Sequence, residues 1–142
     1  MASGRSKIVA RERIARSGFG DRVDLVEGDF YDDPLPSGAD LAWVSAIVHQ
    51  HAREDSRALF AKVHAALAPG GRIMIRDIVM EPNRIEPAEG ALFAVNMLVA
   101  TASGGTFTMD EYTEDLQASG FRDVKLPIKD AWMNSVVEAV KA

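Results

Sequence analysis

The chain has 142 residues, of which 47% are apolar and 26% charged, with a formal net charge of −5 and no cysteine. This length and composition predict one domain over residues 1–142 with a single buried core. The acidic balance argues against a nucleic-acid partner. The lack of cysteine excludes disulfides, thiolate metal ligands and a cysteine nucleophile, and it fits the cytoplasm.

The first part of the chain predicts a helix followed by two strands. Residues 7–17 carry apolar side chains among Arg and Glu at helical spacing, and Gly18 ends that helix. Residues 22–29 alternate apolar and polar side chains, which predicts a strand, and a loop with two prolines follows. Residues 41–48 are apolar apart from Ser45. That pattern is typical of a strand covered on both faces of a parallel sheet and away from its edge.

The middle of the chain predicts two helices and a strand. Apolar residues recur at helical spacing over residues 54–67, and a Pro-Gly-Gly turn at residues 69–71 leads into an apolar strand over residues 72–80. Residues 88–102 are apolar on almost every side, so we expect a helix buried on more than one face, as a pocket wall or a subunit interface. The apolar run within it is too short to cross a bilayer, so no membrane is expected as a partner.

The end of the chain predicts one more helix and a hairpin. Thr108 and Glu111 match a capping box at the start of the helix. Residues 121–129 and 133–141 predict two strands that run antiparallel to one another. Strands that alternate with helices predict an open α/β sheet, mostly parallel with a carboxyl-terminal antiparallel hairpin.

Residues that directly follow strands are the first candidates for a binding site, because ligands of open α/β sheets lie beyond the carboxyl ends of the strands. Asp29 and Phe30, the segment 45–51, and Asp77 occupy such positions. An acid beside an aromatic ring can take a nucleobase. From these residues alone, the pair fits a turn residue followed by a core residue better than it fits a nucleobase site, and both interpretations stay open.

His49 and His51 stand two apart where an apolar run gives way to charge. Two residues at this spacing on a strand face the same way and can share a metal ion. A zinc site needs three or four ligands, and no third candidate stands out in the sequence. We therefore expect no metal site.

Four blocks of the chain, taken in order and spacing, carry a resemblance to a known family. They resemble the carboxyl-terminal part of class I S-adenosylmethionine (SAM)-dependent O-methyltransferases of the small-molecule type. The blocks are RVDLVEGDFYDDPLP, ADLAWVSAIVHQHARED, ALAPGGRIMIRDIVMEP and GGTFTMDEYTEDLQASGF. The resemblance implies a Rossmann-like sheet, SAM as the cofactor, and a small-molecule hydroxyl or phenol as the methyl acceptor.

The resemblance also implies roles for individual residues. Asp29 and Phe30 would hold the adenine of the cofactor, and Ser45 would present backbone near it. His49 falls on the position of the family's catalytic histidine, and Asp77 on that of the carboxylate that orients it. A histidine suits proton removal near neutral pH.

Other positions of the match concern the acceptor. The resemblance implies that Asn96 and Met97 contact substrate, although Asn96 could instead satisfy a neighbouring backbone group. The family usually has aspartate and tryptophan after the histidine, whereas Gln50 and His51 stand here.

The family's first strand, its glycine-rich cofactor loop and its second strand have no counterpart in the 142 residues, so we expect an incomplete sheet, truncated on its amino-terminal side. Either residues 22–29 pair directly with residues 41–48, or a second copy of the chain covers the open edges as a homodimer. We also expect weak SAM binding by this chain alone. The alternative function is a non-catalytic methyltransferase-like remnant that acts in association.

Overall fold

The computed structural model describes residues 4–142, and contacts divide the chain into two compact units, Met1–Asp33 and Pro34–Ala142. The first unit contains helix α1 (Gly4–Ser17), where a helix was predicted, and a 3-10 turn, η1 (Gly20–Arg22). The expectation of one domain over residues 1–142 stays a prediction.

The strand predicted over residues 22–29 is not formed, and this prediction was wrong. Residues 23–29 have no regular secondary structure, and Val26 is largely exposed. Within the unit, the segment is tied to α1 by a hydrogen bond from Arg11 to Glu27 of 3.1 Å. Alternating apolar residues form a strand only where a neighbouring strand supplies backbone partners, and no strand among residues 4–142 pairs with this segment. Direct pairing of residues 22–29 with residues 41–48 is therefore not observed.

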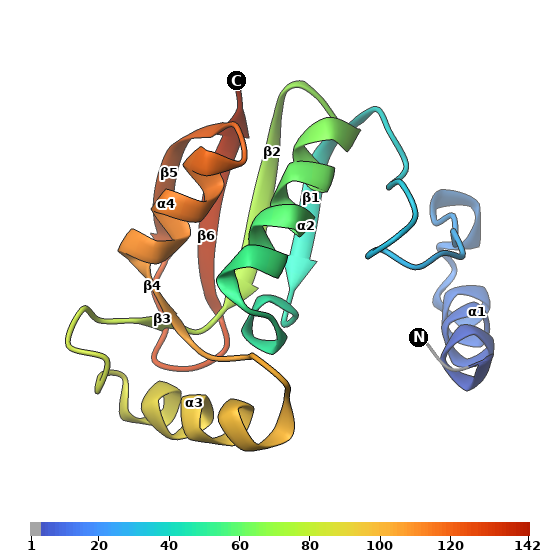
Figure 1. Ribbon diagram of the computed structural model, residues 1–142. Helices are drawn as coiled ribbons and strands as arrows, with labels where there is room; N and C mark the ends of the chain where they lie inside the picture. The colour runs from blue at the N-terminus through green and yellow to red at the C-terminus, as the bar shows by residue number, and fades with distance from the viewer. Residues whose placement is uncertain (1–3) are drawn as a thin grey trace. The chain divides into compact units, whose positions relative to one another are not determined.

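The second unit is built on a four-stranded sheet (Figure 1). Its strands are β1 (Ala39–Ser45), β2 (Leu67–Asp77), β6 (Ser135–Lys141) and β5 (Phe121–Ile128), in that spatial order. β1 and β2 run parallel, and β6 runs antiparallel to both of its neighbours, so three of the four strands share one direction. The predicted α/β sheet, mostly parallel with an antiparallel carboxyl-terminal hairpin, is confirmed.

β1 lies at the edge of this sheet, contrary to the prediction that it would be covered on both faces. Leu41 and Trp43 are 48% and 53% exposed. The prediction failed because an apolar run marks a strand suited to burial but does not supply the elements that would cover it. The predicted turn at residues 69–71 lies within β2, where the pairing with β1 shifts register and Gly70 has a φ of +75°.

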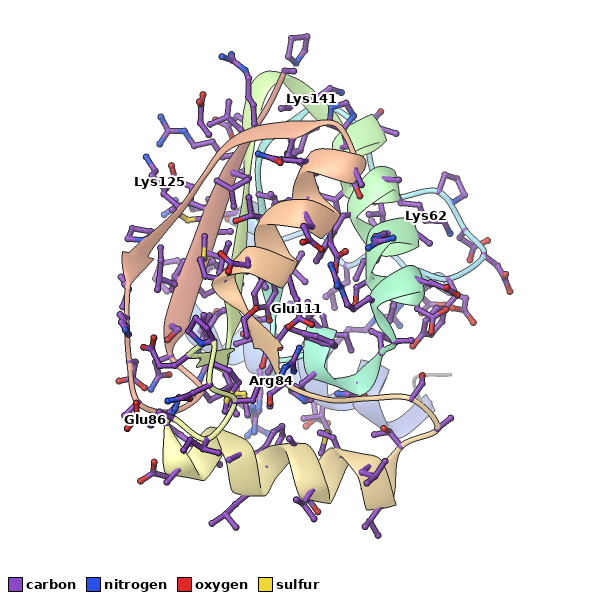
Figure 2. The ribbon with its side chains drawn as sticks, turned by 60° about the vertical axis from the view of Figure 1, so that its left-hand side comes forward. Lys62, Arg84, Glu86, Glu111, Lys125 and Lys141 are labelled. Carbon is purple, nitrogen blue, oxygen red and sulfur yellow. The ribbon has the colours of Figure 1, made fainter. Side chains whose placement is uncertain are left out.

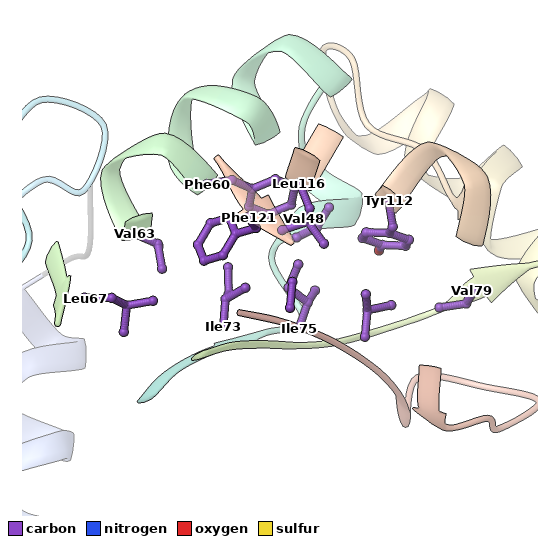
Figure 3. Packing of buried hydrophobic residues seen from close by; sticks show 12 residues of the cluster. Val48, Phe60, Val63, Leu67, Ile73, Ile75, Val79, Tyr112, Leu116 and Phe121 are labelled. Carbon is purple, nitrogen blue, oxygen red and sulfur yellow. The ribbon is translucent and has the colours of Figure 1, made fainter. Parts of the chain in front are cut away.

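Two helices cover one face of the sheet and enclose the core (Figure 3). They are α2 (Arg53–Ala66) and α4 (Met109–Ala118), both close to their predicted bounds. The core between them and the strands includes Phe60, Ile73 and Leu116, each fully buried. This packing supplies most of the stabilisation of the unit, because each buried large apolar side chain contributes about 1.5–3 kcal/mol.

Polar contacts fix both ends of α4. The predicted capping box is confirmed: the Thr108 hydroxyl accepts from the backbone N–H of Glu111, and the Glu111 carboxylate accepts from the backbone N–H of Thr108 at 2.8 Å. Glu111 also pairs with Arg84, and Figure 2 shows the two side chains directed toward each other. Arg53 of α2 donates to the buried Asp115 of α4 at 2.9 and 2.8 Å. These hydrogen bonds raise the pKa of Arg53.

Helix α3 (Ala88–Ala100) lies beyond the carboxyl ends of β1 and β2 (Figure 1). It was predicted to be buried on more than one face, and this prediction was wrong. Only Gly90 and Met97 are buried, whereas Leu98 and Val99 are 77% and 83% exposed. The apolar composition of α3 would suit a helix that packs against protein on two sides, whereas the described residues cover only one side. Side chains on the outer side of α3 extend away from the sheet (Figure 2).

Two short strands, β3 (Val79–Met80) and β4 (Phe107–Thr108), pair in parallel and join the segments before and after α3. None of the helices described between residues 4 and 142 combines the length and apolar character that crossing a bilayer requires.

Candidate active site

The topology brings the chain segments after β1 and at the end of β2 to one place. The two strands are adjacent and parallel, with Ser45 opposite Arg76 in the register. Their carboxyl ends therefore meet at the same edge of the sheet. β1 ends at Ser45, and a single 3-10 turn, η2 (Val48–Gln50), follows it and carries His49. β2 ends at Asp77.

His49 and Asp77 form a buried hydrogen-bonded pair. Nδ1 of His49 lies 2.9 and 3.0 Å from the two carboxylate oxygens of Asp77. Asp77 is only 1% exposed and His49 only 7%. An ionised carboxylate can only accept hydrogen bonds, so Nδ1 carries the proton and Nε2 carries the lone pair. This arrangement fixes the tautomer in which Nε2 can act as a base.

The carboxylate of Asp77 is itself held by two backbone groups. The backbone N–H of Ile78 donates to it at 2.8 Å, and the backbone N–H of His49 donates to it at 3.3 Å. Together with the imidazole, these donors satisfy both carboxylate oxygens in a buried setting. A buried charge is tolerated when it is hydrogen-bonded in this way.

Residues after α3 hold the backbone of His49. The N–H of Gly105 donates to the carbonyl oxygen of His49 at 2.9 Å. Gly104 packs so closely on the same carbonyl that a Cβ at this position would collide with it. No role at the site was predicted for the Gly104-Gly105 pair. A glycine pair after an apolar helix was the available signal, and the close approach to His49 was not readable from it.

Two aromatic residues near His49 were also missed. The ring of Phe93, on α3, lies 5.0 Å from the His49 ring at an interplanar angle of 86°. Trp132, in the connection between β5 and β6, packs against Phe93 at 5.7 Å and 82°. Nothing in the local sequence distinguishes Phe93 from the other apolar residues of its helix.

Two buried titratable groups lie close to the pair. Burial lowers the pKa of His51; the nearby Asp55 opposes this effect and His49 adds to it. Burial also raises the pKa of Tyr112 well above its ordinary value, and the charge of Asp77 contributes in the same direction. Both groups are thus neutral around pH 7, so neither adds a charge beside His49.

The residues expected to hold the cofactor are divided between the two units. Asp29 and Phe30 belong to the first unit, and Ser45 to the second, whose placement relative to the first is not defined. The Asp29 carboxylate accepts the backbone N–H of Tyr31 at 3.0 Å, and the rings of Phe30 and Tyr31 lie 4.3 Å apart. The Asp29 carboxylate, a hydrogen-bond acceptor, thus lies next in sequence to a pair of aromatic rings. Ser45 accepts a hydrogen bond from Arg76 at 3.2 Å.

The residues expected to contact substrate face different surroundings. Met97 is buried, whereas Asn96 is exposed on α3. Gln50, which stands where the family usually has aspartate, is exposed, and its amide lies 3.4 Å from the carbonyl oxygen of Ala46. Within residues 4–142, no three His, Asp or Glu side chains are grouped so that they could hold a metal ion.

Solved structures that match this chain include methyltransferases. The chain matches human N-acetylserotonin methyltransferase in complex with SAM at a TM-score of 0.79 and 31% identity, over 86% of this chain and 34% of that one. It matches an O-methyltransferase family 2 protein from Planctomyces limnophilus in complex with apigenin at a TM-score of 0.85 and 26% identity, over 98% and 42%. The fold is therefore the Rossmann-like α/β fold of methyltransferases.

Residues 7–122 match the model of the O-methyltransferase domain, and the chain belongs to this family. It is 36% identical over 135 residues to 3-hydroxy-5-methyl-1-naphthoate 3-O-methyltransferase of Streptomyces sahachiroi. This match covers 94% of this chain and 39% of that enzyme. It is 39% identical over 105 residues to acetylserotonin O-methyltransferase of Gallus gallus, over 74% and 30%. The chain thus spans well under half the length of these relatives.

Proposed function

We propose that the His49–Asp77 pair is the acceptor-activating part of a SAM-dependent O-methyltransferase site that acts on a hydroxyl of a small molecule. The observation that carries this proposal is the buried contact of Nδ1 with both carboxylate oxygens, at 2.9 and 3.0 Å. Family membership supports methyl transfer to oxygen. The name of the Streptomyces relative, which methylates the 3-oxygen of a hydroxynaphthoate, supports a phenol-type acceptor.

The protein's part in the reaction is positioning and proton removal. The O–H bond of the acceptor breaks and its proton moves to Nε2 of His49, while the oxygen takes the methyl group that a bound SAM would release from its sulfur. The imidazolium that forms keeps its Nδ1–H bond to Asp77, whose negative charge stabilises it. Such general-base assistance contributes roughly 10²- to 10⁴-fold in rate. SAM, when bound, supplies a methyl group already activated by a positively charged sulfur.

The remaining candidate residues are proposed to take the roles that the family resemblance implies. Asp29 and Phe30 bind the adenine, Ser45 lies near the cofactor, and Asn96 and Met97 lie on the acceptor side. The family's glycine-rich loop has no counterpart in this sequence, so the chain alone binds SAM weakly. A dissociation constant in the micromolar range, measured by calorimetry on this chain, would contradict that expectation.

A chimera tests the proposed chemistry. The matching segment of the Streptomyces sahachiroi enzyme is replaced by this chain, and transfer of a labelled methyl group from SAM to a phenol is measured. We expect transfer by the chimera and a loss of roughly 10²-fold or more in the His49→Gln variant. Binding of S-adenosylhomocysteine by calorimetry is the control for an intact cofactor site. A chimera that binds it like the parent enzyme but transfers no methyl group would refute the proposal.

A non-catalytic associating chain is the competing function, and the exposed apolar side of α3 favours it. Leu92, Val95, Leu98 and Val99 are all exposed there, and exposed apolar patches often mark association sites. We accordingly propose a homodimer, which light scattering on the purified chain would test: a monomer at all concentrations would count against it.

The absence of cysteine supports a cytoplasmic location, which fractionation of the source cells would test.

A further inference from the structure

Helix α3 and the turn after it contact His49 at two points and the residues that follow Asp77 at a third. At the start of the helix, Gly90 packs against Ile78 and Met80, directly after Asp77, with no room for a Cβ. In the middle, the ring of Phe93 meets the ring of His49. After the end of the helix, Gly104 and Gly105 contact the His49 carbonyl. The side of α3 that faces the pair is therefore held at both ends.

Asp77 alone leaves part of the His49 geometry undetermined. The hydrogen bond at Nδ1 fixes one atom of the ring, but the terminal torsion of a histidine side chain has broad, roughly two-fold preferences. A second contact on a different part of the ring is needed to restrict that torsion. The Phe93 ring, at 5.0 Å and 86°, has the edge-to-face geometry that aromatic pairs prefer.

We propose that Phe93 is a positioning residue for the imidazole of His49, and that the contact with Trp132 restricts the movement of the Phe93 ring. The rings of Trp132 and Phe93 lie 5.7 Å apart at 82°, so the β5–β6 connection contacts the residue that packs on His49. Gly90 and Gly104 keep α3 close enough for the Phe93 contact to persist. The catalytic meaning of this inference rests on the proposed function, in which Nε2 of His49 takes the proton.

Nuclear magnetic resonance of the 15N-labelled full chain tests this positioning without cofactor or acceptor. Long-range 1H–15N spectra report which ring nitrogen of each histidine carries the proton, and the three histidines are assigned by His51→Gln and His64→Gln spectra. In the wild-type chain we expect a nuclear Overhauser contact between the rings of Phe93 and His49. We also expect a single Nδ1–H tautomer of His49.

Phe93→Met is the decisive variant, because it keeps a long apolar side chain but removes the ring. We expect displaced His49 ring-proton shifts and a second ring orientation whose population rises roughly 2- to 10-fold. Phe93→Tyr keeps the ring and should restore the wild-type spectrum. Leu92→Ala, at a neighbouring position that is 73% exposed, is the matched control and should leave the His49 signals unchanged.

Two outcomes overturn the inference. One is a folded Phe93→Met chain whose His49 shifts and tautomer equal those of the wild type. The other, which needs no variant, is a wild-type chain without the contact between the two rings. If Phe93→Met does not fold, Trp132→Leu replaces it, and unchanged His49 ring shifts in that variant overturn the inference. These spectra do not depend on methyl transfer, so failure of the proposed function would leave them as expected.

Discussion

Replacing Asp77 by alanine should destabilise the fold far more than replacing it by asparagine. Alanine leaves three buried donors without a partner: the Nδ1–H of His49, the backbone N–H of His49 and the backbone N–H of Ile78. Each buried donor left unpaired costs about 1–3 kcal/mol, so the loss is at least about 3 kcal/mol. Asparagine keeps one carbonyl oxygen for Ile78 and should cost about 1–2 kcal/mol.

Urea unfolding followed by tryptophan fluorescence measures this difference, since Trp43 and Trp132 both belong to the second unit. A loss of 3 kcal/mol moves the midpoint by about 1 M or more when the slope is about 1–3 kcal/mol per molar urea. Asp40→Ala removes an exposed acid from β1 and serves as the control, with a change within about 0.5 kcal/mol. Equal midpoints for Asp77→Ala and Asp77→Asn would show that the carboxylate does not organise the buried donors as described.

Three further predictions test other parts of the structure. Burial lowers the pKa of His51 below 6.5, so below pH 6.5 the unfolded chain binds a proton that the folded chain does not, and stability falls as pH falls. His51→Gln should flatten this slope, which is at most about 1.4 kcal/mol per pH unit; an unchanged slope in urea unfolding across pH would contradict the assignment. Thr108→Ala removes the hydroxyl that accepts from the backbone N–H of Glu111 but keeps the backbone N–H that donates to the Glu111 carboxylate, and it should cost about 0.5–2 kcal/mol, more than Thr113→Ala within the same helix; equal costs would speak against the cap. Leu98→Ser on the exposed side of α3 should change the unfolding free energy by less than about 0.5 kcal/mol, whereas Phe60→Ala should cost about 3–5 kcal/mol; comparable thermal midpoints would show that α3 is covered.

The sequence was most informative where the signal is local. The helices α2 and α4, the capping box at Thr108 and the final antiparallel hairpin follow from spacing and capping chemistry that involve neighbouring residues only. The order of strands and helices then limited the fold to an open α/β sheet. In such a sheet the carboxyl ends of parallel neighbours share an edge, which is why Asp77 and the segment with His49 could be singled out before any distance was known.

The failures concern contacts that depend on residues far apart in the sequence. Residues 22–29 alternate like a strand but have no strand to pair with. β1 and α3 carry enough apolar surface for two covered faces, yet in the described chain each has a largely exposed side. Phe93 and Gly104 escaped notice for the related reason that their importance lies in contacts with His49, 44 and 55 residues away. Apolar composition predicts that a surface can be buried, and only tertiary structure says what buries it.

The most direct test of a general base at His49 is how the rate depends on the acidity of the acceptor. In the chimera with the Streptomyces segment replaced, single-turnover methyl transfer is measured with a weakly acidic hydroxyl and with a phenol already ionised at the assay pH. His49→Gln should slow transfer to the first by roughly 10²- to 10⁴-fold and to the second by only a few-fold, because an ionised oxygen has no proton to lose. An equal loss on both acceptors, or no loss on either, would contradict the role assigned to the imidazole.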